Sequence, residues 1–179
     1  MAPPYSIVII GIGNDFRSDD GVGPAVAREF TGLNLRNVRV VGGVADGTDL
    51  LDAWKGTARA YIVDCVFSGA APGTIFRFDA LLDDLPENLF GSRSTHAFSI
   101  PETIRLARTL GQLPQSLIVY GVEGMRFSMG LGLSEAVREA MSDIAGRIGI
   151  EIVKLLQSRG EPDIMKDAEC LKERFGNAS

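Results

Sequence analysis

The chain has few of the residues from which disulfide frameworks and many metal sites are built. Its 179 residues include two cysteines, Cys65 and Cys170, and a single histidine, His96. Two cysteines exclude a disulfide framework and a zinc site made only of cysteines. Any metal site in this chain must therefore draw mainly on carboxylates, with His96 as the one imidazole available.

Long apolar runs and an excess of basic residues are also missing. No run approaches the roughly 20 residues of a membrane span, and the N-terminus lacks a basic start followed by an apolar signal segment. Eighteen Lys and Arg residues against 23 Asp and Glu give a formal net charge of −5, whereas nucleic-acid binding needs a basic face. We therefore expect a cytoplasmic protein with neither a membrane nor a nucleic-acid partner.

Two common catalytic or nucleotide motifs are absent, and a third is incomplete. The chain has no Walker loop and no Gly-x-Ser-x-Gly segment, which removes the simplest ATPase and serine-hydrolase interpretations. Residues 11–14 (Gly-Ile-Gly-Asn) begin like a dinucleotide-binding loop, but Phe16 stands where that pattern needs its third glycine. The nearby acids Asp15, Asp19 and Asp20 would repel phosphate, so we expect no nucleotide cofactor.

What the sequence does contain is the composition and the alternation of an α/β domain. Hydrophobic residues make up 45% and charged residues 23% of the chain, and its length is typical of one domain, which we expect to be monomeric. Apolar β-branched runs alternate with amphipathic segments, which predicts a three-layer αβα sandwich with a mostly parallel sheet of about five strands flanked by helices. The expected strands cover residues 6–11, 37–44, 58–66, 74–78 and 116–122; the expected helices cover 22–30, 49–55, 99–110 and 134–160.

The domain is predicted to cover residues 1–160. Residues 79–95 are polar and irregular, which is typical of a surface loop. Residues 161–179 contain eight charged side chains in nineteen positions, and we interpret them as a solvated C-terminal tail or a weak extra helix. Ser99 and Glu102 fit a capping box, and Ser134 is expected to cap the last long helix.

Carboxylates stand where strands are expected to end, which is the edge where parallel sheets place their sites. Asp20 follows the first strand, although it could equally cap the next helix. Asp64 interrupts the apolar third strand, where burying a charge without a partner is costly. Cys65 could pair with His96 as nucleophile and base, but strand alternation places Cys65 and Asp64 on opposite faces. Glu123 could lie on the same edge.

Together these segments resemble one known family, the hydrogenase maturation endopeptidases. The resemblance spans about residues 6–156 and rests on these segments: Gly11-Ile12-Gly13-Asn14, Asp19-Asp20-Gly21-Val22-Gly23, Val63-Asp64, Pro72-Gly73-Thr74 and Ser94-Thr95-His96. The chain departs from the family pattern in three places: Phe16-Arg17 stands in place of apolar residues, Cys65 stands in place of a small one, and the tail beyond Gly160 is longer than in many members. None of these departures touches the proposed site residues.

The resemblance implies a function as well as a fold. Members remove a C-terminal extension from the large-subunit precursor of nickel–iron hydrogenase once nickel is in place. It implies that Asp20, Asp64 and His96 form the catalytic, metal-sensing site, with nickel presented by the precursor. Asp46-Gly47-Thr48 also matches, less closely, a family segment, and the resemblance implies that this segment influences substrate recognition.

The chemistry of these residues fits that expectation but leaves alternatives open. Two carboxylates and one imidazole suit nickel or zinc and leave coordination positions for further ligands. The same residues would serve a nickel-dependent assembly factor that binds the hydrogenase precursor without cutting it. A nucleotide-binding domain is a third possibility, and it predicts thermal stabilisation by NAD or ATP.

Overall fold

The computed structural model describes residues 6–44, 47–90, 99–159 and 162–176. The strands are β1 (Ile7–Ile12), β2 (Val38–Val44), β3 (Arg59–Val66), β4 (Ile75–Asp79) and β5 (Ser116–Glu123). The helices are η1 (Ser18–Gly21), α1 (Val22–Thr31), α2 (Gly47–Trp54), α3 (Glu87–Phe90), α4 (Ile100–Leu110), α5 (Glu135–Arg159) and α6 (Pro162–Phe175).

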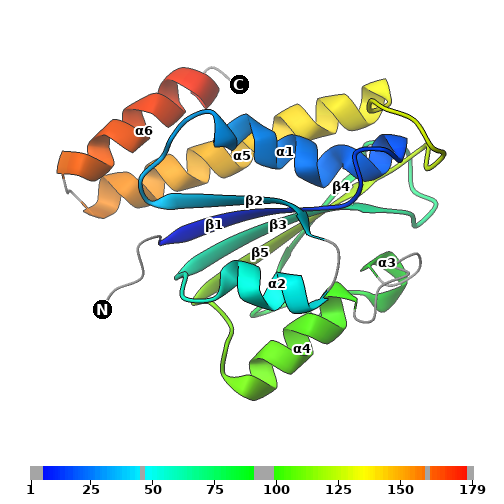
Figure 1. The fold of residues 1–179 in the computed structure, drawn as a ribbon, viewed down its shortest axis with the longest axis horizontal. Helices are drawn as coiled ribbons and strands as arrows, with labels where there is room; N and C mark the ends of the chain where they lie inside the picture. Colours follow the sequence, from blue (N-terminus) through cyan, green and yellow to red (C-terminus); the bar gives the residue numbers. More distant parts are fainter. Residues whose placement is uncertain (1–5, 45–46, 91–98, 160–161, 177–179) are drawn as a thin grey trace.

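The five strands form one twisted sheet in the order β2-β1-β3-β5-β4 (Figure 1). The first four run parallel, and β4 pairs antiparallel with β5 at one edge. Helices α1, α5 and α6 cover one face, while α2, α3 and α4 cover the other (Figure 1). The predicted α/β class and the five-stranded, mostly parallel sheet are therefore confirmed.

The apolar runs of the central strands explain why the sheet is covered on both faces. Ile7 to Ile10 of β1 are each no more than 2% exposed, because alternate side chains point to opposite helical layers. In β3, Tyr61 and Val63 pack with α1 and α5, and Ile62 packs with α2 and α4. The sheet thus builds two cores and brings the carboxyl ends of β1, β3 and β5 to one edge.

The structure favours the helix over the solvated tail for most of residues 161–179. Helix α6 packs on α5 and places Leu171 and Phe175 in the core, with the Phe175 ring 5.0 Å from that of Phe30. A Cβ at Gly149 would collide with Phe175, so this glycine lets α6 approach closely. Asp167 accepts hydrogen bonds from the backbone of residues 36 and 37, which ties α6 to the start of β2.

Two further local expectations had different outcomes. Ser99 and Glu102 form the predicted capping box at the start of α4. Ser134 precedes α5 as expected, but its hydroxyl donates to the carboxylate of Asp19. No helix among the described residues is long and apolar enough to cross a membrane.

Candidate active site

The glycines after β1 let the next segment lie directly on the ends of the central strands. A Cβ at Gly23 would collide with the carbonyl oxygens of Ile12 and Val63. A Cβ at Gly13, whose φ is +127°, would collide with the carbonyl of Asp20. The Gly-x-Gly segment resembles the start of a nucleotide-binding loop, but here its glycines allow η1 and α1 to pack closely against β1 and β3.

This packing brings the carboxylates of Asp20 and Asp64 within electrostatic reach of each other. Burial raises the pKa of Asp64, and the negative charge of Asp20 raises it further, to about 8, although a hydrogen bond from the Cys65 backbone opposes the shift. At neutral pH the Asp64 carboxyl therefore mostly holds a proton. A divalent cation between the two groups would reverse this preference, because it would offset the charge that now disfavours ionisation.

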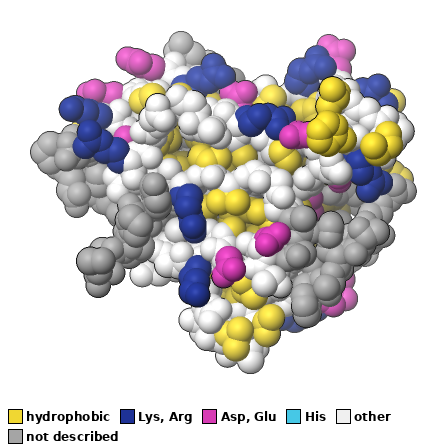
Figure 2. Space-filling view, viewed as in Figure 1, with side chains coloured by type: hydrophobic (Ala, Val, Ile, Leu, Met, Phe, Trp, Pro, Cys, Tyr) yellow, Lys and Arg dark blue, Asp and Glu magenta, His cyan; other side chains and the backbone are white. Residues whose placement is uncertain are grey.

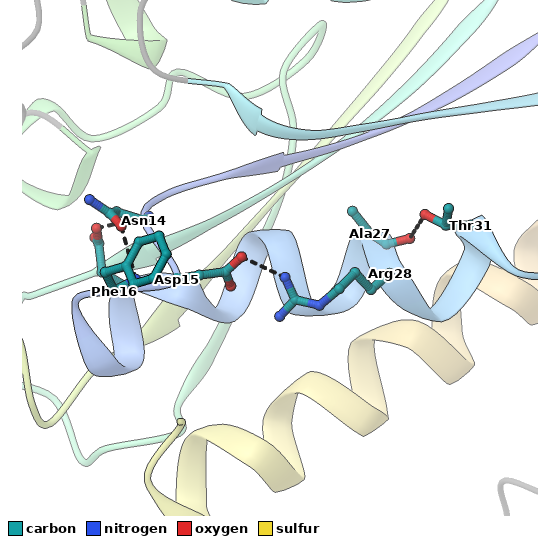
Figure 3. A network of polar contacts seen from close by, with 7 residues as sticks. Asn14, Asp15, Phe16, Ala27, Arg28 and Thr31 are labelled. Atoms are coloured by element: carbon teal, nitrogen blue, oxygen red, sulfur yellow. Dashed lines mark hydrogen bonds and ion pairs between the residues drawn. The ribbon is translucent and has the colours of Figure 1, made fainter. Parts of the chain in front are cut away.

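Asp20 is placed by the loop between β1 and η1. The backbone N–H of Asn14 donates to Asp20 Oδ2 at 3.1 Å, and the Asn14 side chain accepts from the N–H of Phe16 at 2.9 Å. Asp15 forms an ion pair with Arg28 of α1 at 2.6 Å (Figure 3). Each residue of Asn14–Phe16 thus has its own anchor, and the loop presents Asp20 toward β3.

The neighbouring acid, Asp19, has a structural role that the sequence did not reveal. It is fully buried, and its carboxylate accepts from the backbone N–H groups of Met125, Arg126 and Ser134 at 2.6–2.9 Å and from the Ser134 hydroxyl at 3.0 Å. Burial opposes ionisation, but these four donors outweigh it and lower the pKa of Asp19. The two adjacent acids therefore have different roles: Asp19 is buried and structural, and Asp20 lies at the candidate site.

Glu123, at the end of β5, is also occupied by internal hydrogen bonds. It is 1% exposed and accepts from the backbone N–H groups of Ser68 and Gly69 and from the Ser68 hydroxyl, at 2.8–3.0 Å. These contacts fix the loop that follows β3. Glu123 lies on the predicted edge, but its role there is to hold a loop.

Cys65 does not have the properties of a nucleophile. It packs with the core on the α1 and α5 face, and burial together with the charge of Asp64 raises the pKa of its thiol. The thiolate is the reactive form of cysteine. Strand alternation is expected to place Cys65 and Asp64 on opposite faces of the sheet, and the packing of Cys65 on the α1 and α5 face is consistent with this.

The third predicted site residue, His96, lies outside the described residues, as does Asp46. The structure thus brings together Asp20 and Asp64 and does not place His96. Within residues 6–44, 47–90, 99–159 and 162–176, no group of three His, Cys, Asp or Glu side chains is arranged to hold a metal. The two acids alone would leave most coordination positions to other ligands.

Comparisons with known proteins point to one family. The family model described as hydrogenase maturation protease matches residues 24–151. The HupD hydrogenase expression/formation protein of Thiocapsa roseopersicina is 28% identical over 148 residues, which cover 79% of this chain and 65% of that protein. The hydrogenase 2 maturation protease of Escherichia coli is 26% identical over 166 residues, which cover 90% of this chain and 97% of that protein.

The fold is also similar to that of a solved structure. The hydrogenase maturating endopeptidase HybD from Escherichia coli superposes with a TM-score of 0.68 at 21% identity, covering 86% of this chain and 93% of that one. The family model matches well over half of the 179 residues, which confirms the resemblance drawn from the glycine, aspartate and histidine segments. This chain belongs to the hydrogenase maturation protease family.

Proposed function

We propose that this chain is the endopeptidase that removes the C-terminal extension of a nickel–iron hydrogenase large-subunit precursor after nickel insertion. Membership of the maturation protease family supports this proposal, as do the names of the relatives. The observation that carries it is the pair formed by Asp20 and Asp64 at the carboxyl edge of the sheet. We expect the protein to act in the cytoplasm as a monomer, without a nucleotide.

The carboxylate pair fits a metal that arrives with the substrate. The negative charge of Asp20 disfavours ionisation of Asp64, so a cation that binds beside both groups gains affinity by relieving that repulsion. Binding also requires Asp64 to lose its proton, which makes the site weak for free metal near neutral pH. Nickel already held by the precursor would meet these acids together with the imidazole of His96, and cleavage would depend on nickel loading.

The same residues can provide the proton transfers of hydrolysis. Water adds to the scissile carbonyl and loses a proton to a base, and the leaving amine gains a proton as the peptide bond breaks. Once the precursor's nickel has displaced the proton of Asp64, one of the two carboxylates would take the proton from the water and pass it to the leaving amine. The nickel of the precursor would polarise the carbonyl or activate the water.

A non-proteolytic assembly factor is the alternative, and a mass measurement separates the two. Purified nickel-loaded precursor is incubated with the chain and with an Asp64→Asn variant, and intact masses are recorded over time. A loss of mass equal to the C-terminal extension, seen only with the unaltered chain, supports the endopeptidase. Stable binding of the loaded precursor with no change of mass would show a binding factor instead.

A further inference from the structure

Large hydrophobic side chains are exposed beside the candidate site, on two loops that are paired with each other. The loop between β1 and η1 carries Phe16, and the loop between β5 and α5 carries Met125, Met129 and Leu131. The exposed fractions of these side chains are 63% for Phe16, 62% for Met125, 79% for Met129 and 77% for Leu131. Figure 2 shows hydrophobic side chains gathered over the end of the molecule where these loops lie, next to basic ones. We call these four residues the apolar ledge.

Backbone hydrogen bonds fix the two loops of the ledge to each other, in the way that they join neighbouring strands. The N–H of Gly130 donates to the carbonyl of Phe16 at 2.9 Å, and the N–H of Ser18 donates to the carbonyl of Gly130 at 2.8 Å. Asp19 then holds the backbone of Met125 and Arg126. The apolar side chains are thus presented by a fixed backbone, as a preorganised binding surface requires.

Two arginines give the ledge a charge opposite to that of the whole chain. Arg17 and Arg126 are both exposed on these loops, and they stand beside Phe16 and Met125 in the sequence. The chain carries a net charge of −5, so a partner with acidic groups would be repelled by much of its surface and attracted here. Exposed methionine, aromatic and arginine side chains are typical of protein-binding surfaces.

The position of the ledge indicates what binds to it. Phe16 and Arg17 precede Asp20 by four and three residues, and Asp19, the residue before Asp20, accepts a hydrogen bond from the backbone N–H of Met125 on the ledge. A protein whose scissile segment reaches Asp20 and Asp64 would therefore have this surface next to it. We propose that the apolar ledge docks the precursor protein itself, through an apolar segment of the precursor that carries acidic side chains. This inference rests on the proposed function.

The first test replaces the ledge side chains and measures docking separately from cleavage. The double variant Met129→Ser, Leu131→Ser should raise KM and the Kd for nickel-loaded precursor by about tenfold or more. Its kcat at saturating precursor should stay within about twofold of the unaltered chain. Leu110→Ser is the matched control, because Leu110 is 54% exposed on α4, on the opposite face of the sheet.

A second pair of variants tests the charge. Arg17→Glu with Arg126→Glu should also weaken precursor binding about tenfold at low salt, and the difference should shrink as ionic strength rises. Lys55→Glu with Lys154→Glu, at exposed positions after α2 and on α5, makes the same change of net charge and should leave binding unchanged. An equal loss in this control variant would mean that only net charge matters, which would overturn the role of the ledge.

The outcomes separate the ledge from the proposed function. If the unaltered chain does not cleave the precursor, the proposed function fails, whereas the Kd measurement still tests the ledge. Unchanged KM and Kd in the Met129→Ser, Leu131→Ser variant would overturn the docking proposal, as would a fall in kcat alone. A dimer of the unaltered chain that this variant converts to monomer, with unaltered precursor binding, would show that a second copy covers the ledge, and that result would also overturn it.

Discussion

The carboxylate of Asp19 accepts hydrogen bonds from both the backbone N–H and the hydroxyl of Ser134, at 2.6 and 3.0 Å, across 115 positions of sequence. This contact joins the segment after β1 to the start of α5. It keeps Asp20, the next residue, at a fixed place beside β3. A buried acid without catalytic chemistry thus determines where the candidate site residue lies.

Replacing Asp19 by Asn should destabilise the protein and weaken the site. An amide retains one acceptor oxygen, but its NH₂ group would face N–H donors that lose their partner. We expect a loss of about 2–3 kcal/mol in the free energy of unfolding at pH 7, since hydrogen bonds to a charged group are lost. Denaturant titration measures it, with the exposed Asp84→Asn as control. Equal stability of the two variants would contradict the role of Asp19.

Replacing Asp64 by Asn should raise the stability of the protein, in contrast to the replacement of Asp19, and the gain should depend on pH. An unfolded aspartate has a pKa of about 3.9, whereas that of folded Asp64 is about 8. Between these values the folded chain binds more protons than the unfolded chain, so this group lowers stability as pH rises through that window. Asp64→Asn should therefore be more stable than the unaltered chain at pH 8, with the difference shrinking toward pH 5, and it should lose precursor cleavage.

Urea titrations of both proteins at pH 5, 6.5 and 8 measure this difference. A gain in stability that does not change with pH would show that Asp64 is not protonated in the folded chain near neutral pH. Normal processing by the variant would remove Asp64 from the mechanism.

Helix α6 should prove to be part of the folding unit. Phe175 is 7% exposed and contacts Phe30 and Gly149, so Phe175→Ala should cost about 3–5 kcal/mol of unfolding free energy through the cavity it leaves. Phe16→Ala, at an exposed phenylalanine, should change it by no more than about 0.5 kcal/mol. Thermal or denaturant unfolding of both variants checks this. A solvated tail would instead make both changes small.

Much of the sheet could be predicted from sequence, because its strands are marked by strong local signals. In β1 and β3, β-branched runs buried on both faces stop at glycine or at an acid, and Ser99 with Glu102 marks the start of α4. The α6 helix was harder, since only a few apolar residues, Ala168, Leu171 and Phe175, recur among many charges. Their spacing of three and four residues is a helical signal. It is weak in the sequence alone, because the helix is stabilised by packing its apolar face on α5.

The site was predictable only in part for a different reason. Asp64 was conspicuous because a carboxylate stood inside an apolar strand. Asp19 and Asp20 are adjacent and chemically equal in the sequence, so nothing local showed that one would be buried by contacts from residues 125–134. His96 is outside the described residues, and its place beside the two acids stays a prediction.

Recognition of the substrate's nickel is tested most directly by a cleavage time course on two forms of the precursor, nickel-loaded and nickel-free, followed by intact mass. The unaltered chain should cleave only the loaded form, and His96→Ala should cleave neither, because the chain has no second imidazole to replace this ligand. Activity of the unaltered chain should also fall at acidic pH, where a protonated imidazole cannot bind metal. Rapid cleavage of the nickel-free precursor, or cleavage of the loaded form by His96→Ala at the normal rate, would contradict recognition of the substrate's nickel by this site.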